Sequence, residues 1–133
     1  MMRKIALLIF VAVAFAGCGG SNFSDQVSAL SSSLEKTART YNASAPTSLA
    51  ATGSACGSAA GSLRKQSVPA KIPSNATYRQ RAVIHAFKAA LRGYSTCARS
   101  APRLSYAGMV QATREIGTAN SWINRAHGGH RQS

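Results

Sequence analysis

Apolar residues recur at steps of three and four along four stretches of this chain, and this spacing limits the fold more than any other feature. The clearest stretch is 77–98, where one broad arc of a helical wheel holds Val83, Ile84, Phe87, Ala90, Leu91, Tyr94, Cys97 and Ala98. Such steps place side chains on one face of an α-helix, which Thr77 and Gln80 would start as a capping box. Because no stretch alternates with the period of two typical of strands, the pattern predicts an all-α fold.

The other three stretches repeat the spacing with different side chains. Their stripes are Phe23, Val27, Leu30, Leu34, Ala38 and Tyr41; then Leu49, Gly53, Cys56, Ala60 and Leu63; and finally Met109, Ala112, Ile116, Ala119, Ile123 and Ala126. The expected helices therefore also include residues 23–42, residues 46–66 and a last segment that follows a break at Pro102 and ends at Gly128.

The connections between these helices set the topology. Pro46 suits the first turn of the second helix, and the proline-containing segment 67–76 is the longest link. Two short links and one longer one predict an up-down-up-down four-helix bundle over residues 23–128, with a frayed tail at 129–133.

Glycines in the second predicted helix lie four residues apart, at Gly53, Gly57 and Gly61. This strip would let a neighbouring backbone approach closely. Each interior glycine costs about 1 kcal/mol relative to alanine, so the helix needs packing to hold it. A flexible loop is the alternative for this stretch.

The first residues of the chain have the form of an export signal. Arg3 and Lys4 precede an apolar run of twelve residues, Ile5 to Ala16. A membrane-spanning helix needs about 20 apolar residues, so this run indicates a cleaved secretory signal rather than a permanent anchor.

The segment Phe15-Ala16-Gly17-Cys18 resembles the lipobox of bacterial lipoproteins, with phenylalanine where that family usually has leucine. The resemblance covers residues 1–20 only. It implies that residues 1–17 are removed as a signal peptide, that Cys18 carries lipid such as palmitate, and that residues 18–22 form the lipidated cysteine and a short tether. The mature protein would then lie on the outer side of a bacterial cell membrane, or on the outer membrane if the host has two. The alternative is an ordinary signal cleaved after Ala16, which leaves a secreted chain.

Three cysteines in an exported protein leave one without a partner. If Cys18 carries lipid, Cys56 and Cys97 remain as a pair, and each lies on the apolar stripe of its predicted helix. We therefore predict a disulfide between Cys56 and Cys97, which an oxidising compartment permits. Closing a loop of about 40 residues would stabilise the fold by about 4 kcal/mol in the chain-entropy model.

The charge is strongly positive, with a formal net charge of +13. Removing 17 residues from 133 leaves 116, in which 14 basic residues face 3 acidic ones, a net charge of +11. Asp25 suits the first turn of a helix, and Glu35 has the spacing of a surface pair with Arg39. Glu115 alone has no assignment, so an enzyme would require Glu115, His85 and a serine to meet in one pocket.

Five basic or titratable residues form a stripe on the polar side of the third predicted helix. They are Arg81, His85, Lys88, Arg92 and Arg99. The stripe could bind an anionic surface, such as lipid headgroups or wall polymers, or it could be a solvated helix face. Nucleic acid is disfavoured because Phe87 and Tyr94 point to the other side and offer no stacking platform.

We expect no enzyme activity, no cofactor and no metal, since His127 and His130 lack further ligands nearby. The sequence thus predicts a lipid-anchored bacterial cell-envelope protein with a structural or protein-interaction role and envelope proteins as partners. The alternative is an envelope binding module that captures an anionic or lipidic ligand on its basic face or in the bundle interior.

Overall fold

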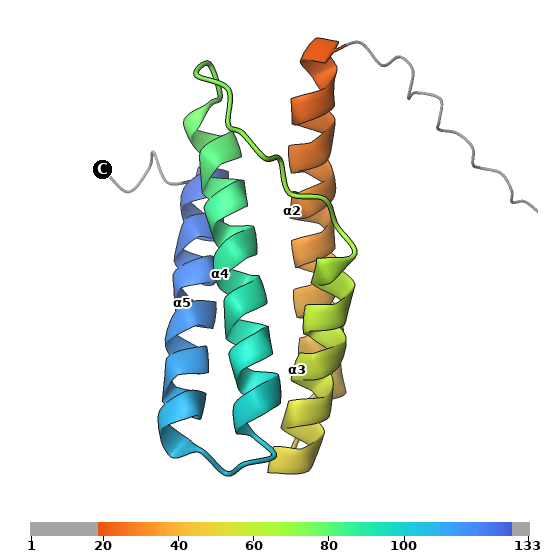
Figure 1. Cartoon of the computed structure of the whole chain (residues 1–133), viewed down its shortest axis with the longest axis vertical. Coiled ribbons are helices and arrows are strands. Elements are labelled where there is room, and N and C mark those ends of the chain that lie inside the picture. Colours follow the sequence, from red (N-terminus) through yellow and green to blue (C-terminus); the bar gives the residue numbers. More distant parts are fainter. Residues whose placement is uncertain (1–18, 129–133) are drawn as a thin grey trace, which may run out of the picture.

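The computed structural model describes residues 19–128 and contains four α-helices: α2 (Gly19–Ser44), α3 (Leu49–Arg64), α4 (Tyr78–Ser100) and α5 (Tyr106–Gly128). Successive helices run in opposite directions, so the predicted all-α, up-down-up-down four-helix bundle is confirmed (Figure 1). Within residues 19–128 there is no strand, as the missing period of two indicated.

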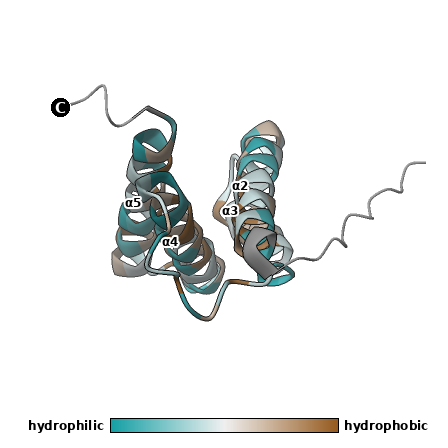
Figure 2. Ribbon diagram, turned by 90° about the horizontal axis from the view of Figure 1, so that it is seen from above, coloured by the Kyte–Doolittle hydropathy of each residue, from teal (hydrophilic) through white to brown (hydrophobic). Residues whose placement is uncertain are grey.

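The helix α4 is the centre of the bundle. Each of the other three helices packs against it, and α2 also packs against α3. Seen from above, α4 and α5 lie together on one side, with α2 and α3 on the other (Figure 2). Among the described helices, the backbone of α5 approaches that of α4 alone.

The core forms where the apolar stripes meet. Its largest fully buried side chains are Leu30 from α2, Cys56 and Leu63 from α3, and Ile84 and Phe87 from α4. Burying a side chain such as Leu, Ile or Phe contributes about 1.5–3 kcal/mol relative to leaving it in water. These large side chains therefore come from three helices and meet on the apolar face of α4, and buried alanines of α5 complete the same core.

The contact between α4 and α5 depends on small side chains. The buried residues of α5 include Ala112, Ala119 and Ala126, which are seven residues apart and so share one face. A Cβ atom added at Gly93 of α4 would lie 2.6 Å from Cγ1 of Ile116 and 3.1 Å from its backbone nitrogen. The two backbones thus approach closely because Gly93 has no side chain.

The glycine strip of α3 does not have the role expected from the sequence. A Cβ at Gly53 would lie 3.2 Å from the Cβ of Ala101, so Gly53 is a packing position. A Cβ at Gly57 or Gly61 would meet nothing within 4 Å. The predicted close approach was therefore wrong at Gly57 and Gly61, because the four-residue spacing drifts around the helix and away from the neighbouring chain.

Two helix starts differ from the predictions. The helix α3 begins at Leu49 rather than Pro46, because the Oγ of Ser48 accepts a hydrogen bond from the backbone nitrogen of Ala51 (3.1 Å) and caps the helix. The helix α2 begins at Gly19 rather than Phe23, so the residues expected to form a tether belong to its first turns. No proline lies between Gly19 and Phe23 to stop the helix from extending.

The predicted start of α4 is confirmed. The backbone nitrogen of Gln80 donates to the Thr77 hydroxyl (3.0 Å), and that of Thr77 donates to Oε1 of Gln80 (2.9 Å). This reciprocal capping box satisfies two backbone donors at the helix start. It fixes where the chain leaves the 65–77 connection.

The predicted disulfide is also confirmed. Cys56 and Cys97 are both buried and bonded, which joins α3 to α4 with a Cα–Cα distance of 5.9 Å. The hydroxyl of Tyr41 on α2 lies 4.0 Å from the Sγ of Cys56. The bond thus fastens the glycine-rich α3 to the central helix close to where α2 packs.

The signal segment, the lipobox-like sequence with Cys18, and the tail at 129–133 lie outside the described residues. None of the helices within residues 19–128 combines the length and the apolar character that crossing a membrane requires.

Candidate functional site

A surface hollow of about 550 Å³ lies over α4, between Arg64 of α3 and Glu115 of α5. We call it the basic hollow. Its lining residues are Arg64, Lys88, Leu91, Arg92, Ser95, Thr96, Arg99 and Glu115. Four of these side chains are cationic, and Glu115 is the one carboxylate among the described residues that line it.

The basic hollow gathers three of the five residues of the predicted stripe. Lys88, Arg92 and Arg99 line it, because steps of four and seven along α4 place them on one exposed side. Arg64 joins them from α3, and its Nη2 donates to the hydroxyl of Ser95 (2.8 Å). Sequence reasoning missed Arg64 because the periodicity of one helix does not say which neighbouring helix borders its polar face.

The other two residues of the stripe have different surroundings. Arg81 donates from Nε to the carbonyl of Ala76 (3.4 Å) and from Nη2 to the carbonyls of Pro73 and Ser74 (3.2 Å each). It therefore holds the connection before α4 in place. His85 stacks on Trp122 of α5, with ring centroids 4.7 Å apart. The structure does not bring these two side chains into the basic hollow.

Glu115 has three polar partners among the described residues, and two of them, Thr96 and Arg92, also line the basic hollow. Its Oε1 accepts a hydrogen bond from the Thr96 hydroxyl (3.2 Å), and its Oε2 accepts one from Nε2 of Gln111 (3.0 Å). The Nε of Arg92 lies 3.8 Å from the same Oε2. The Arg92 side chain is 60% exposed and that of Glu115 is 18% exposed, so solvent screens this ion pair and its contribution is small.

The positive charge of the basic hollow exceeds what Glu115 can neutralise. Arg92 is paired with Glu115, while Nη2 of Arg99 reaches the Thr96 hydroxyl at 3.5 Å. A hydroxyl orients a guanidinium without cancelling its charge. Lys88, Arg64 and Arg99 therefore keep their charges, and the arrangement suits a ligand with several anionic groups.

The catalytic arrangement considered from the sequence is not formed by the described residues. Glu115 contacts Thr96, Gln111 and Arg92, whereas the ring partner of His85 is Trp122. Since His85 and Arg92 are seven residues apart on α4, these two environments are separated by about 10 Å along the helix axis. Glu115 and His85 do not share a pocket.

The carboxylate of Glu35 does not have the expected partner, Arg39. Its Oε2 lies 3.6 Å from Nε2 of His127 on α5. Within residues 19–128, no three His, Cys, Asp or Glu side chains gather as metal ligands would, and His130 lies outside that range.

Burial raises the pKa of the Tyr94 hydroxyl above its ordinary value of 10.0, and the neighbouring Tyr41 raises it further. The centroids of the two rings, one from α2 and one from α4, are 5.4 Å apart. This tyrosine lies in the core rather than in the basic hollow, so its pKa bears on stability.

In the comparisons with known proteins, no protein family, curated protein or solved structure matches this chain.

Proposed function

We propose that this protein is a lipid-anchored envelope binding module whose basic hollow holds an anionic polymer of the bacterial cell envelope. The observation that carries the proposal is the meeting of Arg64, Lys88, Arg92 and Arg99 around one hollow with a single described carboxylate. Phosphate or carboxylate groups spaced along a polymer could contact several of these cations together. The affinity of such a contact falls as salt screens the charges.

The position of the basic hollow favours a polymer as its ligand over the headgroups of the membrane in which the predicted lipid anchor would insert. The helix α2 starts at Gly19, next to the predicted lipidated Cys18, and α4 runs in the same direction as α2 (Figure 1). Arg99 lies in the last turn of α4, at the end of the bundle away from Gly19. At 1.5 Å per helical residue, Lys88 and Arg99 lie about 15 Å and about 30 Å along α4 from its start at Tyr78, which is at the Gly19 end of the bundle.

The binding test uses the protein purified from its host, with insoluble wall material as one probe and phosphatidylglycerol vesicles as another. The test variant is Lys88→Gln/Arg99→Gln, which removes two exposed charges from the hollow. The control is Lys71→Gln/Arg103→Gln, which removes two exposed charges elsewhere. Both variants have the same net charge.

We expect the protein to co-sediment with the wall material at low salt and to be released from it at high salt. If each cation contributes about 1 kcal/mol, the hollow variant should bind roughly 30-fold more weakly, while the control stays close to wild type. Equally weakened binding in both variants would mean that binding depends on the net charge of the protein alone and not on the basic hollow. Absence of binding to wall material would refute the proposal, as would stronger binding to the vesicles than to the wall.

The anchor is tested separately by the intact mass of the protein extracted from host membranes with detergent. A chain that starts at Cys18 with added acyl groups supports the lipid anchor. A bare chain that starts at Gly17 refutes it and makes the protein a secreted one with a free Cys18 thiol.

A further inference from the structure

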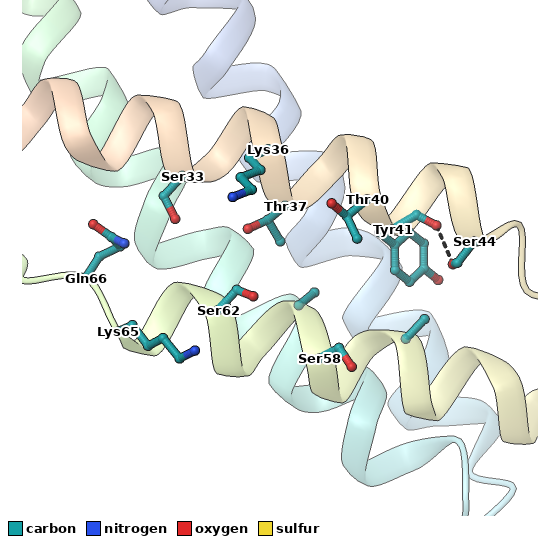
Figure 3. A pocket seen from close by; sticks show the side chains of 12 residues that line it. Ser33, Lys36, Thr37, Thr40, Tyr41, Ser44, Ser58, Ser62, Lys65 and Gln66 are labelled. Atoms are coloured by element: carbon teal, nitrogen blue, oxygen red, sulfur yellow. Dashed lines mark hydrogen bonds between the residues drawn. The ribbon is translucent and has the colours of Figure 1, made fainter. Parts of the chain in front are cut away.

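A second concave surface lies on the other side of the bundle, between α2 and α3. It is a groove of about 400 Å³ (Figure 3). We call it the hydroxyl groove, because its lining includes the side chains of Ser33, Thr37, Thr40, Tyr41, Ser58 and Ser62. None of its lining residues is shared with the basic hollow. The volume falls within the range of about 300–1,000 Å³ that small-molecule sites occupy.

Thr37 is the most informative residue of the hydroxyl groove. It is a buried polar residue with an exposed fraction of 6%, and its side chain extends from α2 towards α3 (Figure 3). Three other helical threonines, Thr52, Thr113 and Thr118, donate their hydroxyls to the carbonyl four residues earlier at 2.8–3.0 Å. Among the described residues, the Thr37 hydroxyl has no such partner. A buried hydroxyl without a partner is unfavourable unless something else hydrogen-bonds to it.

Two lysines complete the hydroxyl groove, with Lys36 on α2 and Lys65 at the end of α3. No Asp or Glu among residues 19–128 lines this groove, and none of them lies within ion-pair distance of either ammonium group. The described surroundings therefore leave both charges available on opposite walls. A ligand between α2 and α3 would meet one cation from each helix.

We infer that the hydroxyl groove binds a sugar or polyol that carries a phosphate group. Serine, threonine and tyrosine hydroxyls both donate and accept, which matches the hydroxyls of a sugar. Lys36 and Lys65 match the phosphate, since charge-assisted hydrogen bonds are the strong ones. Ala55 and Ala59 provide the apolar part of the lining, against which the C–H face of such a ligand can rest.

The same phosphorylated polyol chemistry occurs in free sugar phosphates and in the headgroup of phosphatidylglycerol. Isothermal titration of the protein purified from its host separates the sources. The soluble probes are glucose 6-phosphate, glycerol 3-phosphate, glucose and inorganic phosphate, and the membrane probe is phosphatidylglycerol vesicles. Heat with a soluble phosphorylated probe supports a free ligand. If the vesicles give a heat of binding and Lys36→Gln abolishes that heat, the ligand is the lipid headgroup.

Variants tie the binding to the groove. Lys36→Gln should weaken binding of the phosphorylated probes by about tenfold or more, because a charged hydrogen bond is lost. Thr37→Val keeps the shape of the side chain and should weaken binding by about three- to tenfold. Lys71→Gln, an exposed lysine outside the groove, is the matched control and should bind as wild type does.

Thermal unfolding of each variant separates binding from folding. Valine replaces a buried hydroxyl that has no described partner, so Thr37→Val should not lower the melting temperature. The inference is overturned if none of the probes binds, or if Lys71→Gln weakens binding as much as Lys36→Gln does. It is also overturned if inorganic phosphate binds as tightly as glucose 6-phosphate, because the hydroxyls would then contribute nothing.

Discussion

Replacing two glycines, one at a time, by alanine tests how α5 is held against α4. Gly57 lies in α3 with nothing within 4 Å of an added Cβ. The change Gly57→Ala should therefore stabilise the protein by about 1 kcal/mol, the difference in helix propensity. At Gly93 the added Cβ would lie 2.6 Å from Cγ1 of Ile116 and 3.3 Å from the carbonyl oxygen of Ala112. Overpacking of this kind costs about 1–3 kcal/mol, so Gly93→Ala loses the propensity gain or more.

The informative quantity is the difference between the two variants, because both gain the same helix propensity. We expect Gly93→Ala to be less stable than Gly57→Ala by about 1–3 kcal/mol. Urea unfolding followed by far-ultraviolet circular dichroism measures it. With an m-value of about 2 kcal/mol/M, the midpoints should differ by roughly 0.5–1.5 M. Equal midpoints would show that α5 does not pack closely against Gly93 and would refute the arrangement of α4 and α5 described above.

Two further predictions concern the core. Complete reduction of the bond between Cys56 and Cys97, verified by mass, should lower the free energy of unfolding by about 2–5 kcal/mol in urea titrations; an unchanged midpoint would contradict a stabilising role. The pKa of Tyr94 is raised in the folded state, so folding favours the protonated hydroxyl. Its contribution to the free energy of unfolding is therefore present below pH 10.0 and is lost as the pH rises from there through the folded-state pKa. Unfolding measured across this alkaline range should show a shallower loss in Tyr94→Phe than in wild type, and identical pH profiles would count against the raised pKa.

The sequence predicted the apolar faces of the helices and one contact between them, the disulfide of α3 with α4, but not where α2 and α3 begin. The stripe of α4 and the pairing of Cys56 with Cys97 followed from periodicity and cysteine count, and the structure confirms both. The start of α3 was missed because the Ser48 cap competes with Pro46 as a helix start, and the two signals lie only two residues apart. Local patterns of this kind leave helix ends uncertain by a few residues.

The candidate sites were harder to predict because each combines residues from different helices. The polar face of α4 indicated Lys88, Arg92 and Arg99, but Arg64 reaches the basic hollow from another helix. The hydroxyl groove had no sequence signal, since it depends on how α2 and α3 pack against each other. Serines and threonines spread along two helices resemble an ordinary solvated surface until those helices are placed side by side.

The central position of α4 also bears on how sequences related to this one can diverge. Eleven of its 23 residues are buried, so nearly half of this helix is restricted to small or apolar side chains of fitting shape. The outer faces of α2 and α5 are exposed over most of their length and carry few such restrictions. A chain of this fold can therefore change much of its surface chemistry while α4 stays almost the same.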